Sequence, residues 1–245
     1  MHLIGRFRNP IIVIISLAIT LFFCSFLLSI HSNNVFCVHY IVNPQKQELR
    51  FYWKDQNNKP FKNFKSLNQW IEQGNKTLVF GMNGGMYKED NSPLGLYMED
   101  KKVLTKLNVS KGAGNFYLHP NGVFYITVDK HPFICTTQDF RGKQNIQYAT
   151  QSGPMLLING KINPAFKKGS MNINIRNGAG ILPGNQVLFA MSRQEVNLYD
   201  FAKYFQDMGC RDALYLDGFV SRIWLPEKNY KQPDGNFGVI IGVTK

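Results

Sequence analysis

Polar residues that follow apolar stretches and adjoin glycine are the strongest candidates for chemistry in this 245-residue sequence. Asp217 ends the apolar stretch 214–216, and Gly218 follows it directly. A carboxylate in that position could act as a nucleophile or as a general base. An Asp-Gly pair is also ordinary turn chemistry, so Asp217 alone does not define a site. Ser221, four residues further on, is a second polar candidate.

Two arginines lie at predicted strand ends. Arg193 follows the strand-like stretch 186–191, and Arg176 precedes Asn177 and a glycine. A guanidinium can bind two phosphate oxygens at once, so we expect both arginines to hold a phosphate group. The alternative for Arg176 is a structural role, since arginine often braces loops.

Two glycine-containing segments adjoin apolar strands and could approach a ligand through their backbone. The first contains Asn83, Gly84 and Gly85, and the second contains Ser152 and Gly153. Glycine lets the backbone come close to a ligand, and successive N–H groups can bind an anion. A plain hairpin turn is the alternative for the first segment.

Several familiar catalytic and cofactor motifs are absent from the sequence. There is no G-x-x-x-x-G-K-[ST], no G-x-S-x-G and no complete G-x-G-x-x-G. No C-x-x-C or H-x-x-x-H pair occurs either, which argues against a dedicated zinc site. The sequence therefore identifies no cofactor and no metal ligand, and it leaves a metal requirement open.

The elements that must position these residues are mostly strands. Stretches rich in β-branched and aromatic residues predict strands at 36–42, 49–53, 77–82, 94–98, 123–128, 155–158, 180–182, 187–191, 213–216, 222–225 and 237–243. Helices are predicted at 66–73 and 197–208, the second with Asn197 as its N-cap. We expect a single α+β domain, with a mixed, largely antiparallel central sheet flanked by helices.

The first 31 residues are predicted to be a signal peptide or signal anchor. Residues 32–245 are predicted to form the α+β domain. Arg6 and Arg8 precede an apolar run over 11–30 that contains no charged residue. Twenty residues reach about 30 Å as a helix, the thickness of the bilayer core. No good cleavage site follows, which favours an uncleaved anchor. The protein is expected to be exported, periplasmic or extracytoplasmic, with residues 11–30 as its membrane contact if uncleaved.

The positive charge is dispersed along the chain. Lys and Arg number 28 against 16 Asp and Glu, a net charge of +12, but no block of five like charges occurs. A nucleic-acid partner is therefore not expected. Three cysteines lie outside the apolar run, so one disulfide among Cys37, Cys135 and Cys210 is conceivable. The oligomeric state is left open.

The motifs taken together are more specific than any one of them. In order, they read GMNGGMY, NFYLHPNG, QSGPMLLINGK, IRNGAGIL and SRQEVNLYDFAKYFQDMGCRDALYLDGFVSR. This pattern, over residues 78–243, resembles the phosphodiester glycosidase family, whose bacterial members are often associated with exopolysaccharide or envelope sugars. The resemblance implies a hydrolase that cleaves the glycosidic bond of a sugar-1-phosphodiester.

The resemblance also implies roles for the candidate residues. Asp217 would be the nucleophile or general base, and Arg193 and Arg176 would hold the phosphate. Asn83, Gly85 and Ser152 would line the same pocket, with Asn177 and Ser221 as further candidates. The rest of the expected binding set is Gly84, Gly153 and Gly218. A phosphate leaves without full protonation, so one carboxylate with cationic clamps could suffice where ordinary glycosidases use two carboxylates.

Two other functions are compatible with these residues. A non-catalytic binding protein for phosphorylated envelope glycans would keep the anion site without depending on Asp217. A nuclease or phosphodiesterase would cleave the P–O bond instead of the C–O bond, and it is the least expected because no metal-ligand cluster is visible.

Overall fold

The computed structural model describes residues 36–142, 145–217 and 220–245. The chain divides into two compact units, Met1–Cys37 and Val38–Lys245. The predicted apolar segment 11–30 lies outside the described residues. Within the described ranges, no helix has the length and apolarity needed to span a membrane.

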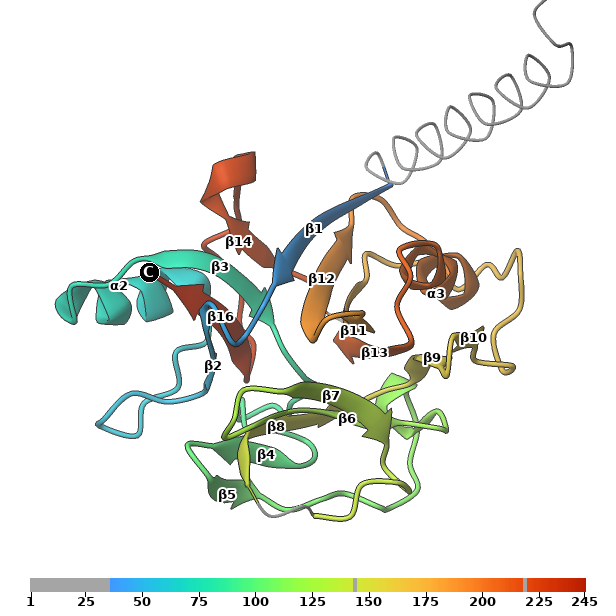
Figure 1. Cartoon of the computed structure of the whole chain (residues 1–245), viewed down its shortest axis with the longest axis horizontal. Helices are drawn as coiled ribbons and strands as arrows, with labels where there is room; N and C mark the ends of the chain where they lie inside the picture. The colour runs from blue at the N-terminus through green and yellow to red at the C-terminus, as the bar shows by residue number, and fades with distance from the viewer. Residues whose placement is uncertain (1–35, 143–144, 218–219) are drawn as a thin grey trace, which may run out of the picture. The chain divides into compact units, whose positions relative to one another are not determined.

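The strands of the second unit form three sheets around a shared centre (Figure 1). The six-stranded sheet has the order β1 (Cys37–Val42), β12 (Gln186–Ser192), β11 (Asn177–Leu182), β13 (Asp212–Asp217), β9 (Met155–Ile158), β10 (Lys161–Ile162). One five-stranded sheet has the order β15 (Tyr230–Lys231), β14 (Ile223–Leu225), β3 (Leu78–Asn83), β16 (Ile240–Thr244), β2 (Glu48–Tyr52). The other has the order β5 (Lys102–Thr105), β4 (Tyr97–Glu99), β8 (Ile146–Ser152), β6 (Gly122–Thr127), β7 (Pro132–Thr136).

The α+β class predicted from the sequence is confirmed, but the single central sheet is not. The described pairs among β2 to β16 are antiparallel. The strands are shared among three sheets because distant segments pair: β16 lies between β3 and β2, with Ile241 opposite both Met82 and Phe51. Strand periodicity marks a buried face but does not name the partner strand.

Two α-helices and two 3-10 turns, η1 (Asn115–Tyr117) and η2 (Pro226–Lys228), complete the unit. Helix α2 (Phe64–Gln73) begins two residues before its predicted start, because Asn63 is the N-cap and accepts from the Ser66 amide at 2.9 Å. Helix α3 (Leu198–Asp207) begins as predicted, with the Asn197 side chain accepting from the Asp200 amide at 2.9 Å.

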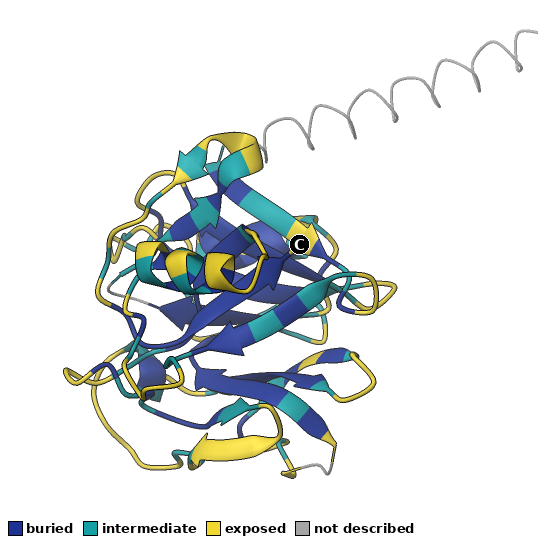
Figure 2. Cartoon of the chain, turned by 90° about the vertical axis from the view of Figure 1, so that its left-hand side faces the viewer, coloured by how far each residue is buried: buried dark blue, intermediate teal, exposed yellow. Residues whose placement is uncertain are grey.

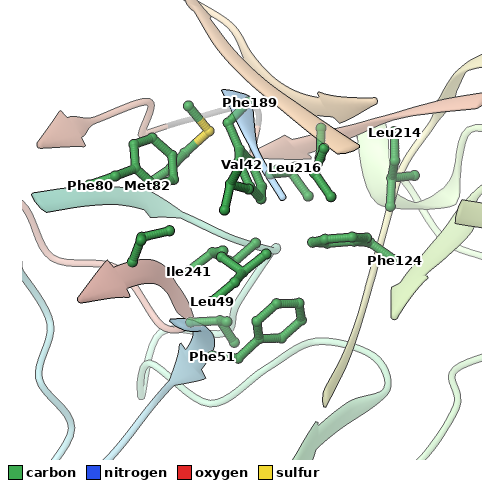
Figure 3. Packing of buried hydrophobic residues seen from close by; sticks show 14 of the residues in the cluster. Val42, Leu49, Phe51, Phe80, Met82, Phe124, Phe189, Leu214, Leu216 and Ile241 are labelled. Carbon is green, nitrogen blue, oxygen red and sulfur yellow. The ribbon is translucent and has the colours of Figure 1, made fainter. Parts of the chain in front are cut away.

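Aromatic side chains from all three sheets meet in one core (Figure 3). Phe189 of β12 contacts Phe80 of β3 and Phe124 of β6, with ring centroids 5.1 and 5.9 Å apart. Phe124 also contacts Phe51 of β2 at 5.3 Å. The strands around these rings are almost wholly buried (Figure 2). Truncating one such ring to alanine would cost about 3–5 kcal/mol, so this core fixes the three sheets against one another.

Candidate active site

Asp217, Asn83 and Asn177 form one buried hydrogen-bonded group at the ends of three strands. Asn83 Nδ2 donates to Asp217 Oδ2 at 2.7 Å, and Asn177 Nδ2 donates to Asn83 Oδ1 at 2.8 Å. The Asp217 amide donates to Asn177 Oδ1 at 3.0 Å. Asp217 is 3% exposed and both asparagines are fully buried. The group joins the six-stranded sheet to the sheet that contains β3.

The Asn83 amide is held in one orientation by further contacts. Its Oδ1 also accepts from the Arg222 amide at 2.8 Å, and its Nδ2 also donates to the Val220 carbonyl. Asp217 Oδ1 accepts from the Val220 amide at 3.4 Å. The carboxylate is therefore positioned before any ligand arrives, which is what a catalytic carboxylate needs.

The two predicted serines support the strand that carries Asp217. Ser152 Oγ donates to the Leu216 carbonyl at 2.6 Å. Ser221 Oγ donates to the Ile175 carbonyl at 3.1 Å and to the Asp217 carbonyl at 3.4 Å. Both serines are buried. Their hydrogen bonds hold the backbone on either side of the Asp217 carboxylate in place.

The predicted glycines lie where neighbouring residues pack tightly against the backbone. A Cβ on Gly84 would lie 2.4 Å from Ile241 Cγ1, and one on Gly153 would lie 2.6 Å from Asn121 Cβ. Gly85 has a φ of +144°, and a Cβ there would lie 2.5 Å from Thr150 Oγ1. A side chain at these positions would collide with Ile241, Asn121 or Thr150. Gly218 lies outside the described residues.

Arg176 is fully buried, and its guanidinium bonds to protein acceptors. Its Nε donates to the Val196 carbonyl at 2.6 Å, its Nη1 to Tyr215 Oη at 2.9 Å and its Nη2 to the Asn172 carbonyl at 2.7 Å. The guanidinium also lies 5.3 Å from the centre of the Tyr215 ring. Arg176 thus braces the strand that leads to Asp217.

Arg193 is exposed and lies over the ring of Tyr230, 5.3 Å from its centre. Its positive charge helps to lower the pKa of His39, after burial and Lys228. Neither Arg193 nor Arg176 is among the described residues that line the cavity at Asp217. The two-arginine clamp predicted from the sequence is not formed at this cavity, because strand-end position does not fix side-chain direction.

The Asp217 carboxylate opens onto a cavity of about 580 Å³. The described residues that line it are Met86, Tyr87, Lys88, Glu89, Asn115, Asp217, Val220 and Asn236. Among them Lys88 is the single cation and Glu89 a second carboxylate. Sequence reasoning missed both, although they follow Asn83 within six residues. The signal was the loop 84–89 itself, since loops at strand ends carry binding residues.

Tyr87 borders the cavity with a raised pKa. Its hydroxyl donates to the Asn236 carbonyl at 2.5 Å. Burial and the negative charge of Asp217 raise the pKa of Tyr87 to about 12. The phenol is therefore neutral at physiological pH and can serve as a hydrogen-bond donor beside the carboxylate.

A second cavity, of about 680 Å³, is larger but offers less chemistry. It is lined by Arg50, Asp100, Lys130 and Tyr148 among others. Arg50 Nη2 lies 3.1 Å from Asp100 Oδ2, and their side chains are 34% and 50% exposed. Solvent screens such a pair, whereas Asp217 is shielded, so the smaller cavity is the candidate active site. In the described ranges, no three His, Cys, Asp or Glu side chains are grouped as a metal site.

Comparison with known proteins identifies the family. Residues 76–243, more than half of the chain, match the sequence model of the phosphodiester glycosidase family, and the chain belongs to this family. The chain is also 38% identical over 187 residues to the uncharacterized protein YigE of Escherichia coli K12, covering 76% of this chain and 73% of that protein. The resemblance predicted from the motifs is confirmed.

Solved structures share the fold. The zebrafish N-acetylglucosamine-1-phosphodiester alpha-N-acetylglucosaminidase catalytic domain, auto-inhibited by its pro-peptide, has a TM-score of 0.57 at 13% identity, over 85% of this chain and 83% of that chain. A hypothetical protein from Synechocystis has a TM-score of 0.55 at 13% identity, over 85% and 59%. At this level of identity the likeness concerns the fold.

Proposed function

We propose that the protein hydrolyses the bond between the anomeric carbon of a sugar and a phosphate oxygen in a sugar-1-phosphodiester. The family is that of the phosphodiester glycosidases. The observation that carries the proposal is the Asp217 carboxylate, buried, held by Asn83 and facing a cavity large enough for a sugar phosphate.

The reaction consumes one water and breaks one C–O bond. The C1–O bond to phosphate breaks, the water oxygen forms a new bond to C1, and the products are the free sugar and a phosphate monoester. The electron pair of the broken bond leaves with the phosphate oxygen, which needs little protonation. Asp217 acts on C1, either by direct attack or by taking a proton from the attacking water.

Lys88 and Glu89 extend this proposal beyond the residues predicted from the sequence. Lys88 is the cation of the described cavity lining, so it would neutralise charge that develops on the leaving phosphate. Glu89 lines the same cavity and gives the site the second carboxylate that ordinary glycosidases use. When the diester binds, the Tyr87 hydroxyl would exchange its hydrogen bond to the Asn236 carbonyl for one to the diester.

The cellular setting is also a proposal. The apolar run over 11–30 with its basic flank supports export or membrane anchoring, and envelope or exopolysaccharide glycans would then be the substrates within reach. Fractionation of cells that express the full chain would test this, since recovery in the cytoplasm contradicts it.

The test of the activity is an assay of the purified full chain on an α-N-acetylglucosamine-1-phosphodiester, the class of compound after which the zebrafish protein is named. Hydrolysis in ¹⁸O-labelled water is expected to place the label in the sugar. Label in the phosphate would identify a phosphodiesterase. Binding of the diester without turnover would favour a binding protein instead.

A further inference from the structure

A small cavity of about 170 Å³ is separate from the Asp217 cavity and shares none of its described lining residues. Its apolar lining includes Leu118, Phe166, Leu198 and Tyr199, and Lys167 also borders it. For comparison, an engineered apolar cavity of about 150 Å³ accepts benzene. The cavity is thus large enough for a short stretch of hydrocarbon.

Two chain segments connect this cavity to Asp217. The first is η1: Asn115, at its start, lines the Asp217 cavity, and Leu118, just after its end, lines the small one. Three residues of 3-10 helix rise about 6 Å. The two cavities are therefore neighbours along η1.

The second connection runs through residues 172–177. Asn172 lines the small cavity, and its carbonyl accepts from Arg176 at 2.7 Å. The Ile175 carbonyl accepts from Ser221 at 3.1 Å, and Asn177 is part of the Asp217 group. The loop that borders the small cavity is therefore anchored at the candidate active site.

This loop exposes apolar side chains at alternate positions. Met171 is 86% exposed, Ile173 41% and Ile175 36%, and Leu118 across the small cavity is 38% exposed. Asn174 pairs with Val196 as in an antiparallel strand, so Ile173 and Ile175 share one face. The Ile173 amide donates to the Met171 carbonyl at 2.9 Å, so the chain turns at Asn172. A group of exposed aliphatic side chains beside an active site is characteristic of a surface that binds an apolar ligand.

The same surface is positively charged. Lys167 and Lys168 are exposed, and within the described ranges no carboxylate lies within 4.0 Å of either ammonium. Apolar side chains together with unpaired ammonium groups fit an amphiphile with a negative head and a hydrocarbon tail.

We propose that this surface is the subsite for the group on the far side of the phosphate, and that the substrate is a sugar-1-phosphodiester of an alcohol with a hydrocarbon chain. The proposal rests on the proposed function, since the phosphate and sugar would occupy the Asp217 cavity. The chain would lie over Leu118 and Ile173 and enter the small cavity, with Lys167 near the phosphate.

The experiment compares methyl, butyl and octyl esters of α-N-acetylglucosamine-1-phosphate as substrates of the purified full chain. Burial of one methylene contributes about fourfold in affinity, so partial burial predicts a kcat/KM at least about tenfold higher for octyl than for methyl. Leu118→Ser and Ile173→Ser are expected to reduce this octyl-to-methyl ratio to about threefold or less. Val103→Ser, at a 57% exposed position of β5, is the matched control and should keep the wild-type ratio.

The outcomes separate this inference from the proposed function. Turnover of all three esters with a ratio near one overturns the apolar subsite and leaves the hydrolase intact. A larger gain from an added sugar on the phosphate than from the octyl chain would instead identify a glycan subsite. If no ester is hydrolysed, the proposed function fails. The apolar subsite is then tested by calorimetric binding of octyl phosphate and methyl phosphate, and equal affinities would contradict it.

Discussion

The two large cavities of this protein differ in how their charged groups are held. The cavity at Asp100 is the larger, about 680 Å³ against about 580 Å³, and its Arg50 and Asp100 side chains are 34% and 50% exposed and paired with each other. In the smaller cavity, Asp217 is 3% exposed and its orientation is fixed by two buried asparagines.

This difference shows that cavity size is a poor guide to chemistry here. Paired, solvated charges contribute little to either stability or reactivity. Burying a carboxylate lowers the stability of the folded protein, and buried charged groups of this kind are characteristic of functional sites. Four predictions test the comparison, from the largest expected effect to the smallest.

Removing the carboxylate charge should lower activity strongly at the Asp217 cavity and hardly at all at the Asp100 cavity. Asp217→Asn is expected to lower kcat by about 10²–10⁴-fold, because it removes the nucleophile or base. Asp100→Asn should leave kcat within about twofold. Steady-state kinetics on the same diester measure both, with circular dichroism to verify folding. Equal losses in the two variants would contradict the assignment of the site.

The second prediction concerns the amides that contact these carboxylates. Asn83→Ala removes the side-chain hydrogen bonds of Asn83 to Asp217 Oδ2, Asn177 Nδ2 and the Arg222 amide, so stability should fall by about 1–3 kcal/mol. Displacement of Asp217 should also lower kcat by up to about 10²-fold. In the larger cavity, Gln147 donates to Asp100 at 2.9 Å, and Gln147→Ala should change neither quantity appreciably. Urea unfolding and kinetics would show the contrast, and a stable, fully active Asn83→Ala would refute it.

The third prediction contrasts a buried with a half-exposed arginine. Arg176→Met removes the donors that the guanidinium supplies to the Val196 and Asn172 carbonyls and to the Tyr215 hydroxyl, so a loss of at least about 2 kcal/mol is expected. Arg50→Met disrupts solvated contacts to Asp100 and Tyr148 and should cost about 1 kcal/mol or less. Denaturant titration of both variants measures the two losses of stability. A larger loss in Arg50→Met than in Arg176→Met would show that burial is not the determining factor.

The fourth prediction uses one tyrosine in each cavity. The pKa of Tyr87 is raised to about 12 by burial and by Asp217. The pKa of Tyr148 is also raised to about 12, by burial and by Asp100, against the opposing charge of Arg50. Of these two tyrosines, Asp217→Asn should therefore lower the pKa of Tyr87 only, and Asp100→Asn the pKa of Tyr148 only. NMR titration of labelled tyrosine rings measures both, and a crossed response would show that the assigned charges are wrong.

These tyrosines also affect stability at alkaline pH. Their pKa values are higher in the folded state than the ordinary value of 10, so above pH 10 the unfolded chain releases its protons first. The free energy of unfolding should fall between pH 10 and pH 12. The slope should be smaller in Tyr87→Phe and in Tyr148→Phe.

The sequence predicted the strand ends and the helices better than the directions of the side chains. The strand before Asp217 and the Asn197 cap follow from local patterns, and both are confirmed. Pairing Asn83 with Asp217 requires strands 134 residues apart to meet, which the family motifs implied but no local pattern encodes.

The arginines show why the rest could not be predicted. Arg176 and Arg193 both adjoin strand ends, yet one is fully buried and the other lies over Tyr230. Which way each points depends on the neighbours supplied by distant strands. Lys88 and Glu89 were missed for a related reason, since a charged loop residue is usually just solvated.

The position of β16 has a consequence for how the protein is made. Residues 240–244 pair with both β3 and β2, and Ile240 lies opposite Asn83. A ribosome-bound chain that has not yet released these residues lacks the strand that holds Asn83 in place. The proposed hydrolysis would thus become possible only after β16 has been synthesised, so a chain truncated before residue 240 should neither fold stably nor turn over substrate.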